Sequence, residues 1–172
     1  DKFVTGEYWE RNRISKSRRE KPEITLLKRI ENLRNHYGFF PPDTIAWQTV
    51  REALVNLPDP RLRIYNSEHV FRAGAITYPG HTGSYIDEPS KTIKAGGHGV
   101  PGGENMIRFE NGEVRYFTIL EAKRIQTFSD DYLITGSWTE GMRQLGNAVP
   151  VKLANLIGKE LIGKLSSKLS LK

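Results

Sequence analysis

The sequence predicts a chain of mixed helix and strand content, and three patterns along it support that prediction. Apolar residues recur at helical spacing over residues 22–37 and again after Thr118. Between these stretches, residues 61–112 hold short apolar or aromatic pieces separated by Gly, Pro, Asp and Asn, which is typical of strands and exposed loops. A long apolar stretch after Pro150 predicts a further helix. At 172 residues and 37% hydrophobic content, the chain can form one or two small packed units.

The first predicted helix begins at Pro22 and ends before Gly38. Proline suits a first helical position because no backbone donor is needed there. The apolar positions of this helix follow one face: Leu26, Ile30, Leu33 and Tyr37. The stretch before it, RISKSRREKP, is polar and basic, and we expect a loop or mobile arm there.

Three later helix starts and one hairpin are expected from local motifs. In a capping box, a Ser or Thr before the helix is followed three residues later by Glu, and each good cap contributes about 1 kcal/mol. The pairs that fit are Thr49 with Glu52, Thr118 with Glu121, and Ser137 with Glu140. In the stretch ENGEV, Asn-Gly stands between alternating segments, which predicts a β-hairpin.

Composition limits the classes of function. The chain has no cysteine, which removes disulfides, thiolate zinc sites and any cysteine nucleophile within it, and its four histidines lack metal-ligand spacing, so no metal is expected. No apolar run is long enough to span a membrane and the mean hydropathy is −0.53, so we expect an intracellular protein without membrane association. The net charge of +6 lies at the two ends of the chain, where it fits either DNA or plain solvation.

The stretch Gly-Asn-Ala-Val-Pro, residues 146–150, stands before the long apolar stretch. A helix N-terminus carries unpaired N–H groups and partial positive charge, which suit a carboxylate or phosphate. Gly146 would allow close approach, Asn147 could cap or hydrogen-bond, and Pro150 would start the helix. The same residues fit an ordinary helix start, so the residues alone leave both interpretations open.

Two longer stretches resemble a known family. VRYFTILEAKRIQTFSDDY followed by RQLGNAVPVKLANLIG resembles the last two motifs of the DNA (cytosine-5) methyltransferases. TVREALVNLPDP is similar to the segment that enters their target recognition region, and DEPSKTIKAGGHG to its Thr-Ile signature and glycine loop. The resemblance covers residues 49 to about 162, while residues 1–48 and the tail GKLSSKLSLK match nothing recognisable.

The resemblance implies a mixed α/β fold in which a small, strand-rich target recognition domain is followed by helices that complete a Rossmann-like methyltransferase catalytic domain. The expected boundaries are a basic N-terminal arm with an amphipathic helix at 1–48, the target recognition domain at 49–136, and a C-terminal helix packing on the catalytic domain at 137–172. The family's Pro-Cys nucleophile and early S-adenosylmethionine loop do not occur here. The chain therefore resembles the C-terminal part of such an enzyme, natural subunit or fragment, and is expected to be inactive alone.

The resemblance also implies roles for individual residues. The segment that helps bind S-adenosylmethionine is expected to be Gly146, Asn147, Ala148 and Val149. The residues expected to scaffold the recognition region are Arg115, Glu121 and Gln126. No catalytic residue is expected in this chain, since the nucleophile would come from a partner subunit or domain.

Double-stranded DNA is the expected substrate, read by residues 61–112. Polar, aromatic and glycine residues there could reach phosphates and base edges, and the candidates are Arg72, Tyr78, His81, Thr82, Ser84, Lys91, Thr92, Lys94, Gly96, Gly97, His98, Gly99 and Arg108. Arginine or lysine to guanine is the commonest specific contact, so Arg72, Lys91, Lys94 and Arg108 are the candidates for G·C recognition. A flexible surface loop remains an alternative for the glycine-rich stretch.

Two functions from different classes follow. The first is the recognition part of a two-part cytosine-5 methyltransferase, by family inference from a bacterial restriction-modification system and located in the cytoplasm with the nucleoid. The second is a non-catalytic DNA-binding or regulatory module derived from such an enzyme. The intact Gly-Asn-Ala-Val-Pro segment favours the first, because a pure DNA binder has no use for a donor site.

Overall fold

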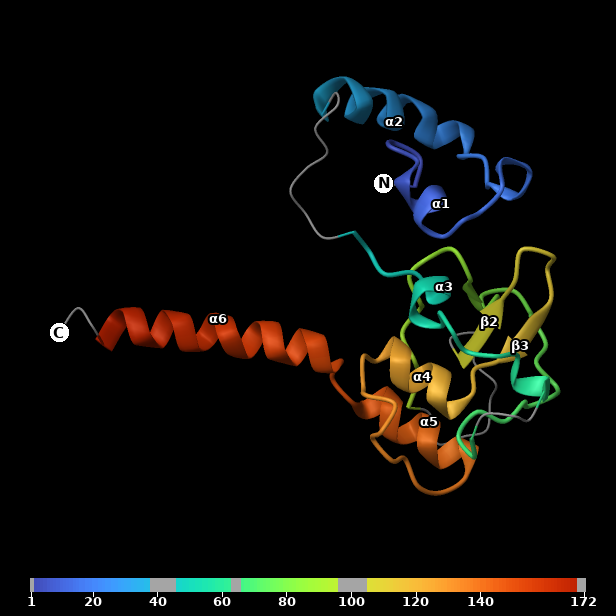
Figure 1. Ribbon diagram of the computed structural model, residues 1–172, viewed down its shortest axis with the longest axis vertical. Helices are drawn as coiled ribbons and strands as arrows, with labels where there is room; N and C mark the ends of the chain where they lie inside the picture. The colour runs from blue at the N-terminus through green and yellow to red at the C-terminus, as the bar shows by residue number, and fades with distance from the viewer. Residues whose placement is uncertain (1, 38–45, 63–65, 96–104, 170–172) are drawn as a thin grey trace. The chain divides into compact units, whose positions relative to one another are not determined.

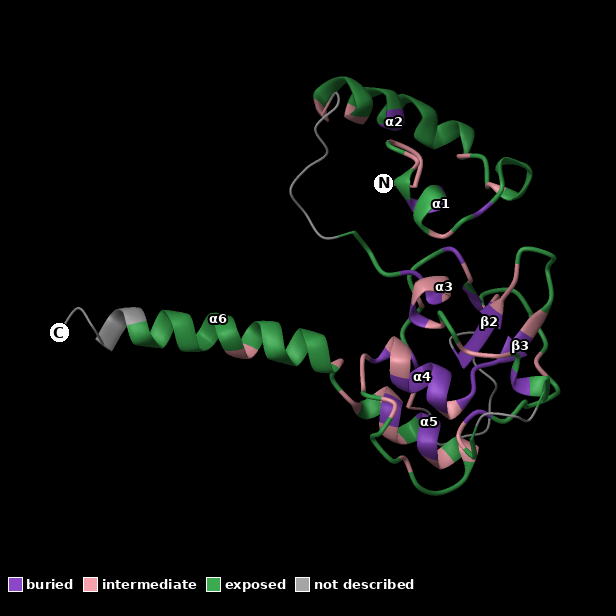
Figure 2. Ribbon diagram, in the orientation of Figure 1, coloured by how far each residue is buried: buried purple, intermediate pink, exposed green. Residues whose placement is uncertain are grey.

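The computed structural model describes residues 2–37, 46–62, 66–95 and 105–169, with side chains described to residue 166. The chain divides into two compact units, residues 1–47 and 48–172 (Figure 1). Each unit has its own buried residues (Figure 2), so each is taken in turn.

The N-terminal unit contains α1 (Glu7–Arg11), a 3₁₀ turn (Lys16–Arg18) and α2 (Ile24–Tyr37). The helix expected from Pro22 is thus confirmed as α2. Residues 13–22, expected to be a loop or mobile arm, are irregular apart from that 3₁₀ turn. The sequence did not predict α1, which packs Tyr8 and Trp9 with Ile14 and Phe3 in a small core. Three aromatic residues among the first nine are enough for this core, and they lie just before the basic stretch on which the expectation of an arm was based.

Polar contacts close the N-terminal unit around that core. The Arg34 guanidinium on α2 donates to the carbonyls of Phe3 and Val4, at 2.7 and 3.2 Å. Lys2 pairs with Glu20 and Arg19 with Glu10, each at 2.6 Å. Since these partners come from both ends of the unit, the basic segment is folded back on itself.

The C-terminal unit is built around a small sheet and short helices. Its elements are α3 (Val50–Ala53), a 3₁₀ turn (Pro60–Leu62), β1 (Ser84–Tyr85), β2 (Met106–Arg108), β3 (Val114–Tyr116), α4 (Ile119–Ile125), α5 (Trp138–Asn147) and α6 (Val151–Leu169). The strand order is β1-β2-β3, with β1 parallel and β3 antiparallel to β2. The core joins the sheet to the helices through Val50, Ile93, Ile107, Phe117, Ala122, Met142 and Leu145. This is a mixed α/β unit, as expected.

The predicted hairpin is confirmed, whereas most of the other predicted strands are wrong. β2 and β3 pair with Ile107 opposite Arg115, and Gly112 takes φ +85° in the turn that joins them. Residues 66–83, in which strands were expected, are irregular apart from one bridge between Tyr78 and His81. Short aromatic pieces between glycines predict strands poorly when no long neighbour is present to pair with them.

The capping motifs place the helix starts. Both halves of the box are present at Thr49 with Glu52 and at Thr118 with Glu121. The third is present in its first half, since Ser137 accepts from the Glu140 N–H while the Glu140 carboxylate pairs with Arg143 at the surface.

α6 is exposed along its length. Every described side chain from Val151 to Ser166 is exposed apart from the half-buried Gly158. Its large apolar side chains are between 44% and 66% exposed, and they are Val151, Leu153, Leu156, Ile157, Leu161, Ile162 and Leu165. Within the unit, this helix therefore presents apolar surface without a neighbour on which to bury it (Figure 2).

Arg115 on β3 and Glu121 on α4 form a buried ion pair at 2.7 Å, which generates a stability prediction. Arg115→Met leaves a carboxylate in the interior without its guanidinium, so we expect the free energy of unfolding to fall by about 3–5 kcal/mol. Arg143→Met, which breaks an exposed pair with Glu140, is the control and should leave the urea midpoint close to wild type. Equal midpoints for the two variants would contradict the structural role of the buried pair.

Candidate functional site

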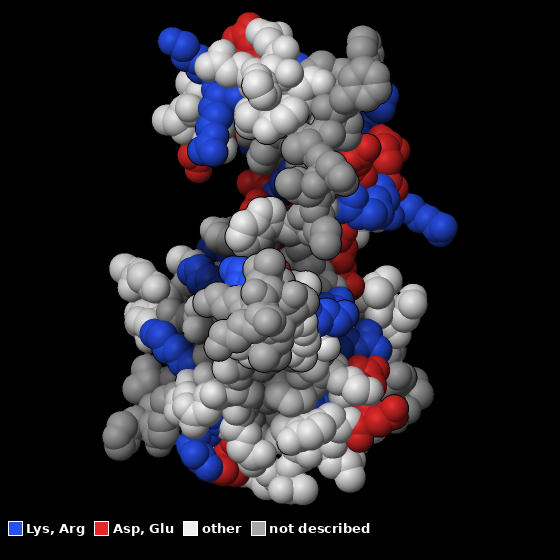
Figure 3. Space-filling model, turned by 90° about the vertical axis from the view of Figure 1, so that its left-hand side faces the viewer, with Lys and Arg blue, Asp and Glu red and all other residues white. Residues whose placement is uncertain are grey.

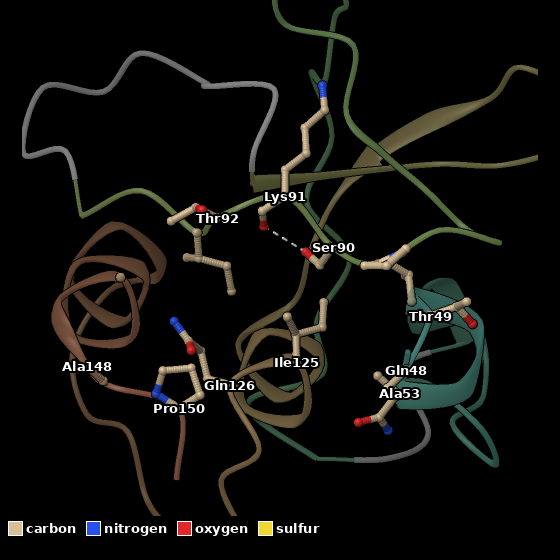
Figure 4. A pocket seen from close by; sticks show the side chains of 14 residues that line it. Gln48, Thr49, Ala53, Ser90, Lys91, Thr92, Ile125, Gln126, Ala148 and Pro150 are labelled. Atoms are coloured by element: carbon tan, nitrogen blue, oxygen red, sulfur yellow. Dashed lines mark hydrogen bonds between the residues drawn. The ribbon is translucent and has the colours of Figure 1, made fainter. Parts of the chain in front are cut away.

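A hollow of about 360 Å³ in the C-terminal unit brings together the segments singled out by the sequence (Figure 4). Its walls come from four stretches, 48–53, 89–93, 125–126 and 146–150. The polar side chains on it include Gln48, Ser90, Lys91, Thr92 and Gln126. The hollow thus lies where the start of α3, the Thr-Ile segment, the end of α4 and the Gly-Asn-Ala-Val-Pro segment meet.

The Gly-Asn-Ala-Val-Pro segment is an elbow between two helices. Gly146 and Asn147 are the last residues of α5, Ala148 is extended, and α6 begins at Val151. The expectation that Gly146 and Asn147 open the long helix is therefore wrong. They lie at a helix C-terminus, whose partial charge is negative and does not favour an anion.

The N-terminus of α6 is occupied by the chain itself. The Val151 N–H donates to the Gln126 carbonyl at 3.1 Å, and the Lys152 N–H donates to the Thr127 hydroxyl at 2.9 Å. Gln126 also reaches α5, because its side-chain amide donates to the Leu145 carbonyl at 2.9 Å. The end of α4 thus ties down both sides of the elbow.

Thr127 has an unusual backbone conformation. Its φ is +58°, in the left-handed region that β-branched residues rarely adopt. That conformation ends α4 and points the hydroxyl at α6. No sequence motif predicts this contact, since it joins residues 25 positions apart.

Gly146 is required by close packing inside the chain. A Cβ at this position would lie 2.5 Å from the Ala95 nitrogen and 2.6 Å from the Lys94 carbonyl carbon. The space beside Gly146, where another group was expected to approach closely, is therefore occupied by the backbone that follows the Thr-Ile signature. Ala148 and Pro150 line the hollow, whereas Asn147 and Val149 are exposed.

Some of the residues near β1 that were expected to bind DNA are buried, and others are exposed. Ser84 is buried, and its hydroxyl accepts from the Lys91 N–H at 3.1 Å, so it organises the loop and does not face solvent. Lys91 and Thr92 are exposed at the hollow, and the Lys91 amine donates to the Thr82 hydroxyl at 2.9 Å. These contacts hold residues 82–92 as one loop.

The other candidates lie outside the hollow. Tyr78 and His81 stack with ring centroids 4.3 Å apart, and Arg72 lies over the Trp138 ring. Arg108 lies over the Tyr85 ring, while the Lys94 N–H donates to the Asn105 side chain at 3.2 Å. The remaining four candidates, Gly96, Gly97, His98 and Gly99, lie outside the described residues.

The three residues expected to be structural are buried. Arg115 donates to both carboxylate oxygens of Glu121 at 2.7 Å, and Glu121 accepts from the Thr118 N–H at 2.9 Å. Gln126 joins α4 to α5 as described above. Their burial fits the structural role that was expected of them.

On the face that Figure 3 draws, the described side chains do not gather charge of one sign over the C-terminal unit. On the side of the C-terminal unit drawn in Figure 3, Lys and Arg side chains alternate with acidic and uncharged ones. Five described arginines of this unit are neutralised by carboxylates: Arg51, Arg61, Arg115, Arg124 and Arg143. In the described part of the chain, no helix is long and apolar enough to cross a membrane.

The close packing at Gly146 generates a second stability prediction. Gly146→Ala places a methyl group against the backbone of residues 94–95, so we expect a loss of about 1–3 kcal/mol in unfolding free energy. Gly158→Ala, in open space on α6, is the matched control and should cost nothing. Urea unfolding followed by circular dichroism compares the two, and a Gly146→Ala protein as stable as wild type would refute the packing.

Known proteins with similar sequences are bacterial methyltransferases. The chain is 38% identical over 82 residues to the type II methyltransferase M.HindV of Haemophilus influenzae, covering 45% of this chain and 27% of that protein. It is 32% identical over 107 residues to M.Eco47II of Escherichia coli and 34% over 108 residues to M.Sau96I of Staphylococcus aureus; these alignments cover 62% and 63% of this chain and 24% of each relative. The chain thus spans about a quarter of the length of these relatives. No solved structure matches it.

A protein-family model matches most of the chain. The model for C-5 cytosine-specific DNA methylases matches residues 5–163. The match includes most of residues 1–48, a stretch in which the sequence motifs alone showed no resemblance. The chain belongs to the C-5 cytosine-specific DNA methylase family.

Proposed function

We propose that this chain is the DNA-recognising part of a DNA (cytosine-5) methyltransferase of a bacterial restriction-modification system. The observation that carries the proposal is the packing of Lys94 and Ala95 on Gly146. That contact joins the family's Thr-Ile segment, on the recognition side, to its Gly-Asn-Ala-Val-Pro segment, on the donor side. Both segments line one hollow, which supports a role in holding DNA and methyl donor in a fixed relation.

The nucleophile comes from a partner. Cytosine-5 methylation requires a thiolate that adds to C6 of a flipped-out cytosine, so that C5 can take the methyl group and later lose its proton. The 172 residues contain no cysteine. A catalytic domain or subunit with the Pro-Cys nucleophile therefore completes the enzyme, and this chain is inactive alone.

α6 is the surface on which that partner packs. Its apolar side chains are exposed, and its first turn is fixed by Gln126 and Thr127. A helix held at one end and apolar along its length can add to the core of a second domain. This supports the 137–172 segment as the part that completes the catalytic domain.

S-adenosylmethionine would lie against the elbow when the two parts combine, and it supplies the methyl group. Gly146 and Ala148 line the hollow, and Asn147 offers an exposed side-chain amide. The N–H groups of Val151 and Lys152 are already bonded within the chain, so they do not hold the donor's carboxylate. Among these residues, the Asn147 amide is the donor best placed for that role.

Complementation tests the proposal. Transfer of radiolabelled methyl from S-adenosylmethionine to mixed-sequence DNA is measured with this chain alone, with the catalytic partner alone and with both. We expect incorporation only in the mixture. DNA binding by this chain without any incorporation would instead support a non-catalytic recognition module.

Asn147→Asp tests the donor site in the assembled enzyme. The new carboxylate repels the carboxylate of S-adenosylmethionine, and a repulsion of about 1 kcal/mol weakens donor affinity about fivefold. DNA affinity should not change by more than a small factor. The control is Asn32→Asp on exposed α2, and equal donor affinity for both variants would remove Asn147 from the donor site.

A further inference from the structure

Among the described arginines of the C-terminal unit, two differ from the others. Five are paired with carboxylates, as described above. Within the described residues, no carboxylate lies at ion-pair distance from Arg72 or Arg108. Each of these two instead stacks on an aromatic ring, so their donors are not committed to an acidic partner inside the unit.

Arg72 has the better-built of the two stacks. Its guanidinium carbon lies 4.5 Å from the centre of the Trp138 ring, compared with 5.1 Å between Arg108 and Tyr85. Arg72 is also exposed, whereas Arg108 is half-buried in β2. The N–H groups of the Arg72 guanidinium therefore face solvent while the guanidinium rests on the Trp138 ring.

The Trp138 ring is fixed by its neighbours. Its indole N–H donates to the Phe117 carbonyl at 2.8 Å, and its ring meets the buried Tyr116 ring edge-on at 5.2 Å. Burial raises the pKa of the Tyr116 phenol, and the nearby charge of Arg72 opposes that rise. The half-buried ring under Arg72 is thus held against the core by these contacts.

The backbone before Arg72 is also anchored. His69 is buried, its Nε2 donates to the Pro58 carbonyl at 2.8 Å, and its Nδ1 is hydrogen-bonded to the Thr118 hydroxyl at 3.0 Å. His69 is three residues from Arg72, so the chain is anchored close to the residue whose guanidinium lies over the Trp138 ring. A restrained planar group loses less freedom when it binds.

We propose that Arg72 reads a guanine in the target DNA, with Trp138 as its positioning residue. This inference rests on the proposed function of the chain in DNA recognition. Stacking leaves the edge of the guanidinium free to donate two hydrogen bonds to O6 and N7 of guanine in the major groove. Lys91 and Lys94, the other exposed candidates, carry a point charge without such a fork.

Selection of bound sequences tests the assignment without requiring catalysis. Random-sequence duplexes are enriched on the full chain, and on its complex with the catalytic partner, for wild type, Arg72→Ala, Arg72→Lys and Trp138→Leu. For Arg72→Ala we expect discrimination at one G·C position to fall about 5- to 150-fold. Lysine should not restore it, and Trp138→Leu should weaken discrimination at the same position. Trp138→Phe, which keeps a ring, should retain more of it.

Arg143→Ala is the matched control, since it removes an exposed arginine that is paired with Glu140. It should leave every position unchanged. A uniform loss of affinity in Arg72→Ala, with a shallower salt dependence and rescue by lysine, would mean a phosphate contact and would overturn the guanine assignment. Unchanged selectivity in Arg72→Ala, with methylation by the assembled enzyme intact, would overturn it while leaving the proposed function standing. Position-specific loss without methylation in any mixture would support Arg72 and refute the methyltransferase role.

Discussion

The carboxylate of Glu121 is the contact on which the C-terminal unit depends. It accepts from both arms of Arg115 on β3 and from the Thr118 N–H, so one buried charge joins the sheet to the start of α4. A buried ion pair is stable only when its remaining hydrogen bonds are satisfied, and here the capping box supplies one of them. The direction of α4 relative to the hairpin follows from this arrangement.

The C-terminal end of α4 in turn positions the two helices that follow it, α5 and α6. Gln126 bonds α5 through its side chain and α6 through its carbonyl, and Thr127 adds a second bond to α6. The elbow between α5 and α6 is held there, with Gly146 against the backbone of residues 94–95. The hollow is therefore the product of contacts between segments that are distant in the sequence.

That difference between local and distant contacts explains how much could be predicted. Two capping boxes, the Asn-Gly hairpin and α2 were predicted correctly, because a few neighbouring residues determine each of them. The elbow was assigned to the wrong end of a helix, because Gly-Asn followed by Pro fits either a helix end or a helix start. Gly146 was identified as a point of close approach, but its partner, Ala95, lies 51 positions away and has no sequence signal. Trp138 was missed for the same reason, since it contacts Arg72, a residue that is distant from it in the sequence.

Residues 66–83 contribute little to the regular structure, and this has an evolutionary consequence. The segment joins the core at His69 and leads into β1 at Ser84, both of which are buried, while the residues from Val70 to Gly80 are almost all exposed. Substitutions of the exposed side chains from Val70 to Gly80 leave the buried contacts of the hairpin, α4 and the elbow in place. Under the proposed role in DNA recognition, such a chain acquires a new DNA preference by changing a few surface side chains, without first losing stability, and related proteins diverge in target while keeping one architecture.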